Sequence, residues 1–523
     1  MRKFNLRFLL PTKKFLMLSS LVILCGLILS LSLRGLPGNP NGETLNSSVW
    51  QGDGPFELSP ERGRFALLYT LVENHSFQFP DAIGKFAIPD VAVSKGKYVS
   101  LFAPLLSFVA IPGYVIGKYF GASQVGTFAM ISVVALLNVI LLRLIAIRLG
   151  ADSIAATIAS LVFLFGTPAF SYAVTLYQHH LSTFLILLSI YALLKSNKAW
   201  SLIVVFFVCA LAIPLDYPNL FFMFPISIFA LGRIISFESI KSKLSVRINL
   251  FKLLTPLVMI LPILFFLWFN QASYGNPFQL SGTLPSARHL LDNVSGNPNT
   301  STQLQALSTS NRSDTALKFF QTRYLLNGFY IHFVSPDRGV IYYAPVVLFG
   351  IIGFFLSLRK NVQMTPLLAS IVGANILLYS MWGDPYGGWA FGSRYLIPAY
   401  AILSIFIALF LTYWRKSVMF LAGFLLVAFY SIAVNTLGAI TTNAIPPQVE
   451  VLNLEKLSGL VQKYTYAKNW DILVAGHSKS FVYQTFLKNY LSAIQFYQIL
   501  IVSIFIFVGG LISYYYAHNN KGE

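Results

Sequence analysis

The stretch LFAPLLSFVAIPGYVIGKYFG, residues 101–121, decides the topology of this chain. It is apolar and long enough to cross the hydrocarbon core of a bilayer, which is about 30 Å thick. It also contains Pro104, Pro112 and Gly113, which favour a broken, re-entrant or surface-lying segment. Counting it as a span would move every later loop to the opposite side of the membrane. We therefore expect residues 101–121 to stay on the outer side.

The composition of the whole chain is that of a membrane protein. Of the 523 residues, 56% are hydrophobic, 15% are aromatic and only 11% are charged, which is far from the usage of soluble domains. Many separate apolar runs are long enough to span a bilayer as helices, whereas a transmembrane barrel would show short alternating strands. We predict an all-α polytopic membrane protein with one membrane domain over residues 1–523.

Hydropathy predicts about twelve transmembrane helices, which place both termini on one side of the membrane. They are expected near residues 15–33, 124–146, 153–171, 180–196, 199–215, 218–234, 253–270, 339–358, 364–381, 395–413, 417–440 and 493–516.

The formal net charge of +19 follows this topology. Basic residues gather at one set of span ends, including Arg143, Arg148, Lys195, Lys198, Arg233, Arg415 and Lys416. Such clusters mark the cytoplasmic ends of spans. The excess charge is therefore a topology signal and not a nucleic-acid-binding surface. We expect a multi-pass protein of the cell membrane.

Three outer loops follow from these spans, at residues 34–123, 271–338 and 441–492. The first is rich in acids: Glu43, Asp53, Glu57, Glu61, Glu73, Asp81 and Asp90. The short cytoplasmic loops leave no room for an ATP-binding module, and the sequence has no phosphate-binding glycine loop. We therefore expect chemistry on the extracytoplasmic side, with residues 34–123 as the catalytic loop.

The segment SPERGRFALLYTLVE, residues 59–73, has the pattern of an amphipathic helix. Ser59 is a suitable N-cap and Pro60 suits the first helical position. An apolar stripe follows at helical spacing, formed by Phe65, Leu68, Tyr69 and Val72. Glu61 begins this stripe. We expect the helix to rest on the outer membrane surface with Glu61 directed at the bundle; alternatively, an acid in a first turn only complements the helix dipole, by about 0.3–1 kcal/mol.

Residues 88–106, IPDVAVSKGKYVSLFAPLL, complete a longer pattern. Its order of acid, arginine, aromatic residue, helix, G-K-Y and proline resembles the GT-C glycosyltransferases, which include the protein O-mannosyltransferases and the aminoarabinose transferases that modify lipid A. Three residues match the family's acid-x-x-R-Y motif, namely Glu61, Arg64 and Phe65, and two match its Y-x-x-K-P-P motif, namely Tyr98 and Pro104. The usual aspartate is a glutamate here, and Phe102 replaces the usual lysine, for which Lys97 could substitute.

The resemblance continues through GTPAFSYAVTLYQHHLSTFLILL (166–188), LDYPNL (215–220) and WGDPYGGWAFGSRYLIP (382–398), which look like a bacterial and archaeal branch. It implies a polyprenyl-phosphate-linked sugar donor and an acceptor protein, lipid or glycan. It also implies transfer on the non-cytoplasmic face, usually with inversion at the anomeric carbon.

The chemistry of such a transfer needs a base and a phosphate clamp. An acceptor hydroxyl requires a carboxylate within hydrogen-bond reach. Glu61 is the first candidate, and Asp90 could orient the acceptor or hold a cation. Arg338 and Arg394 each lie just outside a predicted span and could clamp phosphate oxygens. Alternatively, both arginines are interface anchors.

Four further residues complete the candidates for donor binding: His179, His180, Asp216 and Tyr386. The two histidines could touch sugar or phosphate, or donate to backbone carbonyls. Asp216 is either a functional acid or a turn residue, and Tyr386 either stacks on a sugar or belongs to the interfacial aromatic belt. The pattern lacks the spacing of a zinc site, so no metal ligands are predicted; a divalent cation is compatible with the sequence but not required by it.

Two alternatives to a sugar transferase remain open. One is a polymerase or ligase of lipid-linked glycans, and the other is a non-catalytic transporter or flippase. A transferase requires residues 59–123 to fold over the outer mouth of the bundle. A transporter requires a cavity that reaches the middle of the membrane.

Overall fold

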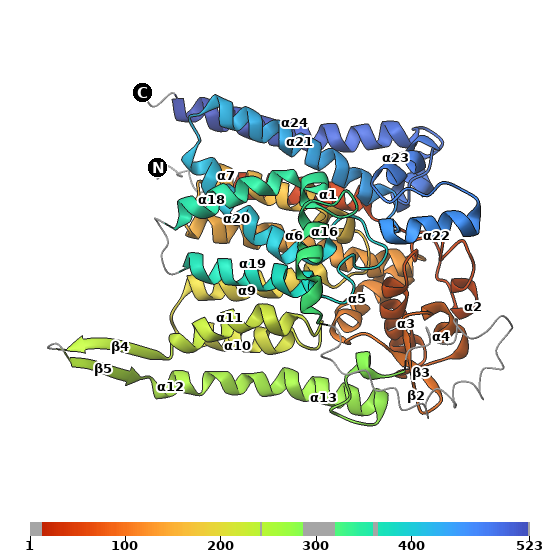
Figure 1. Cartoon of the computed structure of the whole chain (residues 1–523), viewed down its shortest axis with the longest axis horizontal. Coiled ribbons are helices and arrows are strands. Elements are labelled where there is room, and N and C mark those ends of the chain that lie inside the picture. Colours follow the sequence, from red (N-terminus) through yellow and green to blue (C-terminus); the bar gives the residue numbers. More distant parts are fainter. Residues whose placement is uncertain (1–12, 241–242, 286–319, 359–363, 521–523) are drawn as a thin grey trace, which may run out of the picture.

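The computed structural model describes residues 13–240, 243–285, 320–358 and 364–520. Within these ranges the fold is a bundle of long helices with a region of short helices and strands at one end (Figure 1). Helix α1 (Lys13–Ser32) begins, and helix α24 (Ala493–Asn520) ends, at the opposite end of the bundle. The predicted outer loop at residues 271–338 includes residues 286–319, which lie outside the described residues.

The bundle accounts for most of the chain. Between α1 and α24 it contains α6 (Ser123–Arg148), α7 (Ser153–Phe165), α8 (Ala169–Ala173), α9 (His179–Lys195), α10 (Ala199–Leu211), α11 (Asn219–Gly232), α12 (Leu250–Leu253), η2 (Thr255–Met259), α13 (Ile260–Tyr274), α17 (Val340–Tyr343), η6 (Pro345–Val347), α18 (Leu348–Ser357), α19 (Met364–Ser380), η7 (Arg394–Leu396), α20 (Ile397–Tyr413) and α21 (Val418–Ile440). The smaller region contains α2 (Gly42–Leu45), α3 (Ser59–Glu73), α4 (Asp81–Ala87), α5 (Leu105–Tyr119), η3 (Ser281–Thr283), η5 (Thr322–Tyr324), α16 (Leu325–Phe333), α22 (Gln448–Ser458), α23 (Ala467–Val474) and the π-helical turn η8 (Tyr483–Leu487).

Apolar helices of the bundle lie in the regions where the spans are predicted. Among the described residues, five helical stretches are long and apolar enough to cross a membrane: Ser123–Arg148, Leu250–Tyr274, Arg394–Tyr413, Val418–Ile440 and Ala493–Ala517. Shorter apolar helices cover the other predicted spans, and one further apolar helix is α5. Such runs form helices because lipid offers no hydrogen-bond partners, and a helix satisfies its backbone hydrogen bonds internally.

Both ends of α5 lie at the same end of the bundle. The backbone N–H of Leu105 donates to Pro214, in the turn between α10 and α11, at 2.9 Å, and Gly38 donates to Gly121 at 2.7 Å. Helix α5 packs so closely on α6 that a Cβ atom at Gly126 would lie only 2.2 Å from the carbonyl oxygen of Gly113. Glycine at this position therefore allows the close contact. In this structure residues 101–121 therefore return to the end at which they start, and do not traverse the bundle.

The prediction of an all-α chain holds for the bundle but not for every loop. Strands β1 (Gln78–Phe79), β2 (Val91–Ser94) and β3 (Lys97–Ser100) form an antiparallel sheet in the order β1-β3-β2. Residues Lys95 and Gly96 connect β2 to β3 with positive φ angles of 51° and 73°, as in tight two-residue hairpins. Strands β4 (Ile235–Ile240) and β5 (Lys243–Ile248) pair at the opposite end of the bundle (Figure 1).

Helix α3 forms as predicted, but its surroundings differ from the prediction. Its N-cap is Leu58, and Ser59 lies inside the helix, where its hydroxyl donates to Asp90 at 2.6 Å. Phe65 is fully buried against the ring of Phe56, at a centroid distance of 4.6 Å. The rest of the loop covers the first part of the apolar stripe: Phe65 and Leu68 are buried in protein, and Tyr69 and Val72 are partly buried.

Candidate active site

Glu61 is a buried acid in the first turn of α3. Both of its carboxylate oxygens are buried and have no hydrogen-bond partner in the described part of the chain. Burial, followed by the negative charge of Glu57, raises the pKa of Glu61 to about 8, although Arg34, the Leu58 amide and Lys479 partly oppose this shift. An unpaired buried carboxylate is costly, and such groups concentrate at functional sites.

Glu57 lies four residues before Glu61 in the opposite electrostatic environment. Arg34 Nη1 donates to one oxygen of Glu57 at 2.6 Å, and Lys479 Nζ donates to the other at 2.8 Å. The Asn443 backbone N–H and the Thr442 hydroxyl donate to the same carboxylate at 2.6 and 2.5 Å. Burial alone would raise the pKa of Glu57, but Lys479 and Arg34 outweigh it and lower the pKa to about 2.

Arg64 extends the site from α3 to the turn between α10 and α11. Its Nη2 donates to Gln178 Oε1 at 2.6 Å, and Gln178 Nε2 donates to Asp216 Oδ2 at 2.8 Å. Its Nη1 donates to the carbonyl of Pro60 at 2.9 Å. The guanidinium lies 4.3 Å from the ring centroid of Phe102. Phe102 is thus a stacking partner of Arg64.

Tyr177 lies at the centre of the site. The guanidinium carbons of Arg64 and Arg394 lie 5.6 and 4.9 Å from its ring centroid. Its buried hydroxyl has no hydrogen-bond partner among the residues described. Burial and then the Glu61 charge raise the pKa of this hydroxyl, whereas the two arginines lower it. Glu61, Arg64 and Arg394 therefore lie close enough to one side chain to act on it electrostatically.

Arg394 and His179 add further unsatisfied groups beside Tyr177. Arg394 Nη2 donates to the carbonyl of Gly387 at 2.7 Å; apart from a side-chain interaction with Tyr395, its buried Nε and Nη1 have no hydrogen-bond partner within the described ranges. The His179 ring stacks on Tyr177 at a centroid distance of 5.9 Å, and its Nε2 also lacks a partner there. A buried carboxylate, two guanidinium groups and an imidazole thus act on one aromatic side chain, an arrangement suited to a polar, anionic ligand.

The remaining predicted site residues occupy different places. Asp90 accepts from Ser59, and its charge acts on Arg62 and Arg64, so it lies beside the Glu61 site. His180 contacts the Ala169 carbonyl through Nε2, at 2.7 Å. The structure therefore brings Asp90 to the site and places His180 in the protein framework.

Arg338 also has its donors occupied. Its three nitrogens donate to the carbonyls of Asp337, Tyr386, Gly388 and Ile445 at 2.8 to 3.2 Å. Tyr386 contributes this backbone carbonyl and is half-buried. A phosphate at Arg338 would have to displace these hydrogen bonds, unlike a phosphate at Arg394.

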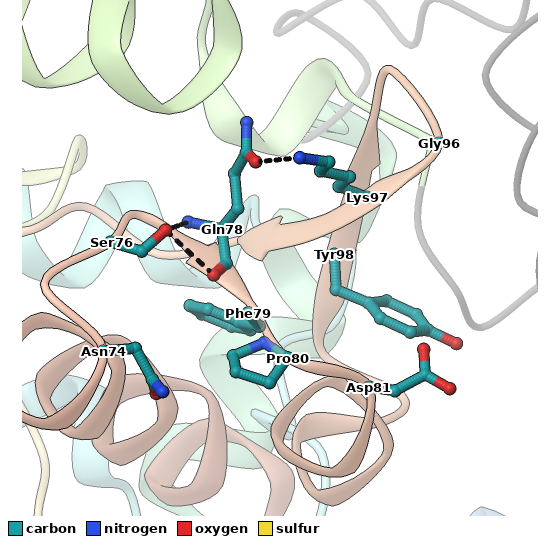
Figure 2. A pocket seen from close by; sticks show the side chains of 9 residues that line it. All are labelled: Asn74, Ser76, Gln78, Phe79, Pro80, Asp81, Gly96, Lys97 and Tyr98. Carbon is teal, nitrogen blue, oxygen red and sulfur yellow. Dashed lines mark hydrogen bonds between the residues drawn. The ribbon is translucent and has the colours of Figure 1, made fainter.

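Lys97 and Tyr98 line a separate surface depression of about 390 Å³ at the C-terminal end of α3 (Figure 2). Lys97 Nζ donates to Gln78 Oε1 at 2.7 Å. The other lining residues are Asn74, Ser76, Phe79, Pro80, Asp81 and Gly96. At 1.5 Å per helical residue, Asn74 and Glu61 are about 20 Å apart along α3. The depression is therefore distinct from the Glu61 site.

Metal ligands do not cluster in the described part of the chain, where no group of three His, Cys, Asp or Glu side chains could hold an ion. The sequence made no firm prediction of a metal. Cys25 and Cys209 are both buried free thiols.

The sequence analysis did not single out four residues of the site: Arg34, Tyr177, Gln178 and Lys479. It named Glu57 only as one of the seven acids of the first loop and gave it no role. Some local signals existed. Glu57 stands one helical turn before Glu61, and Gln178 directly precedes His179. The pairing of Glu57 with Lys479 had no local signal, because 422 positions separate them.

No family model and no curated protein sequence matches the chain. Solved structures do show likenesses. Against ArnT from Cupriavidus metallidurans in the apo state, the TM-score is 0.46 at 12% identity, over 96% of this chain and 76% of that one. Against the same protein bound to undecaprenyl phosphate, it is 0.46 at 13% identity, over 96% and 77%. Against the Archaeoglobus fulgidus oligosaccharyltransferase tethered with an acceptor peptide, it is 0.39 at 13% identity, over 94% and 55%. Both proteins are GT-C superfamily members, but likenesses below a TM-score of 0.5 assign no donor, acceptor or catalytic residue to this chain.

Proposed function

We propose that this protein is a glycosyltransferase that moves a sugar from a polyprenyl-phosphate donor to an acceptor hydroxyl, with inversion at the anomeric carbon. One observation carries the proposal. The buried, unpartnered carboxylate of Glu61 acts electrostatically on Tyr177, and the guanidinium of Arg394, whose side-chain partner in the described residues is Tyr395, lies 4.9 Å from the ring centroid of the same tyrosine. A base and an anion clamp are the two groups that such a transfer needs.

The proposed step uses these groups in one displacement. The acceptor oxygen forms a bond to the anomeric carbon while the bond from that carbon to the phosphate oxygen breaks. Glu61 takes the hydroxyl proton, and general bases of this kind contribute about 10²–10⁴-fold. The leaving phosphate carries the electron pair away and is held by Arg394, with the charge of Arg64 nearby. Attack from the face opposite the phosphate inverts the carbon.

The position of the site supports a lipid-linked donor. Helix α3, which carries Glu61, lies at the end of the helical bundle where the short helices and strands gather (Figure 1). A donor there would keep its sugar-phosphate in the polar region and its tail in lipid. A transferase requires residues 59–123 to fold over the outer mouth of the bundle, and the position of α3 supports that arrangement.

The charge distribution supports an extracytoplasmic site in the cell membrane. The basic residues Arg148, Lys195 and Arg233 lie at helix ends on the opposite side of the bundle from α3. Basic clusters face the cytoplasm in multi-pass proteins. The Glu61 site would then face outward.

A direct assay tests the proposal. Purified full-length protein in detergent is mixed with polyprenyl-phosphate sugars and candidate acceptors, and released polyprenyl phosphate is measured with and without a chelator. Release that depends on acceptor and is lost in Glu61→Gln supports the proposal. Transfer of a whole glycan from a diphosphate donor would identify a ligase instead. Binding without any turnover would contradict an enzymatic role.

A further inference from the structure

The start of α3 is tied to distant parts of the chain through Glu57. Leu58 caps the helix, and the backbone N–H of Glu61 donates to the Leu58 carbonyl at 3.2 Å. Glu57 directly precedes this cap, and its side chain is 1% exposed. Because Glu57 is immobilised by four donors, it also fixes the direction in which α3 leaves the loop.

The cations that hold Glu57 are themselves anchored. Beyond Glu57, Arg34 donates to the carbonyls of Ala439 and Gly438 at 2.9 and 2.5 Å, where α21 ends. Lys479 donates to the carbonyl of Gly54 at 3.1 Å. The network therefore joins the end of α1, the loop before α3, the end of α21 and the loop before α24.

We propose that Glu57 is the positioning residue of this site: its anchored carboxylate fixes the start of α3 and so orients Glu61, which lies one helical turn further along and within reach of the charge of Glu57. The inference rests on the proposed function and deepens it. It makes the third outer loop, which supplies Lys479, a part of the catalytic apparatus.

Several charged or titratable groups face Glu61 from the elements packed around it. They are Arg34 after α1, Glu57, Arg62 on α3, Tyr172 on α8, Tyr177 before α9, and Lys479. Within this set, Glu57 favours the protonated form of Glu61, whereas Arg34 and Lys479 favour the ionised form. Removal of the Glu57 charge should therefore lower the pKa of Glu61, and removal of the Lys479 charge should raise it.

The test compares Glu57→Gln with Lys479→Met. In Glu57→Gln the acidic limb of the kcat/KM profile should move to lower pH, and in Lys479→Met to higher pH, each by about 1 unit as for a nearby charge. Lys463→Met is the matched control, because Lys463 forms an exposed ion pair with Asp471 at 2.6 Å in the same loop. It should leave the limb in place. Glu57→Asp, which keeps the charge, should keep the wild-type limb with reduced turnover.

A second measurement does not depend on catalysis. Infrared pH-difference spectra of the purified protein should contain a protonated carboxyl band that disappears in Glu61→Gln, and its titration should move with the same two signs. Equal loss of activity in both variants without opposite shifts would overturn the proposal. If Glu57→Gln does not fold, an unmoved limb in Lys479→Met overturns it alone. Opposite infrared shifts in a protein without transferase activity would sustain the positioning role while refuting the proposed function.

Discussion

Arg64 and Asp216 are joined through a single side chain, the amide of Gln178, which accepts from the arginine at 2.6 Å and donates to the carboxylate at 2.8 Å. This bridge connects α3 to the turn between α10 and α11. It holds two opposite charges at a fixed separation without a direct ion pair. One glutamine therefore adds a link between the loop helix and the bundle.

Replacement of Gln178 by leucine should destabilise the protein and weaken turnover together. Arg64 and Asp216 each lose a hydrogen bond to a charged group, and such bonds are worth about 1.5–3 kcal/mol. Thermal unfolding in detergent should show a lower midpoint. Gln462→Leu is the control, because the Gln462 amide donates only to Ser458 and Leu460 at the surface. An unchanged midpoint in Gln178→Leu would mean that the bridge is not structural.

Glu61→Gln should reduce turnover by about 10²-fold or more, since it keeps the shape of the side chain but removes the base. Donor binding and expression should survive. Glu73→Gln, on the same helix, is the control: Glu73 pairs with Lys118 at 2.7 Å and should give a mild effect. Near-normal turnover in Glu61→Gln, together with an inactive Asp90→Asn, would assign the base to Asp90.

Activity should fall as the pH is lowered through about 8. Burial raises the pKa of Glu61 to about 8 from an ordinary value of 4.5, and only the ionised carboxylate can accept a proton. The same raised pKa has the opposite effect on stability: activity should rise with pH, whereas the free energy of unfolding should fall. Between the two values the native state binds more protons than the unfolded chain, so the free energy of unfolding should decrease as the pH rises. Unfolding measured across this range should depend less on pH in Glu61→Gln.

Arg394→Lys should reduce kcat/KM for the donor by about 10- to 100-fold, because lysine keeps the charge but loses the planar fork that binds two phosphate oxygens. The measurement is donor turnover together with binding of polyprenyl phosphate alone. Arg323→Lys, at an exposed arginine near the predicted outer face, should have little effect. Wild-type donor affinity in Arg394→Lys would make Arg394 an anchor of η7 and not a clamp.

A cysteine at Lys95 should react with a membrane-impermeant thiol reagent from outside, whereas a cysteine at Lys198 should react only after the membrane is opened. Both positions are exposed at opposite ends of the bundle. The native cysteines are buried, so their background should be low. The reverse labelling pattern would place the Glu61 site in the cytoplasm.

The sequence predicts the bundle well because spans are local features. A single apolar segment in lipid can satisfy its backbone hydrogen bonds only as a helix. Hydropathy alone therefore locates α6, α20 and α21. It predicts the loops less well. The β1-β3-β2 sheet depends on a short hairpin at Lys95 and Gly96 inside an otherwise helical region. The apolar stripe on α3 does not show by itself whether lipid or protein covers it.

The candidate site was predictable only where motif and position coincide. Glu61 and Arg64 share one helix, so their periodicity places them together. Arg338 and Arg394 have similar sequence settings, but backbone carbonyls fill the donors of Arg338, whereas Arg394 has one backbone acceptor, Gly387, and a side-chain interaction with Tyr395. This difference arises from the path of the loop at residues 386–388, which no local pattern encodes.

The network of hydrogen bonds and ion pairs around Glu57 also has a consequence for biogenesis. Arg34 and Glu57 emerge early in synthesis, but Lys479 follows 422 residues after Glu57 in a chain of 523. Contacts so distant in sequence close late, after the intervening loops have been ordered. Until then the nascent protein carries an incomplete charge triad at the end of its first helix. The Glu61 site therefore matures only when nearly the entire chain has been inserted, and a chain truncated before residue 479 would lack both Lys479 and the last helix of the bundle, α24, and would not gain a competent site.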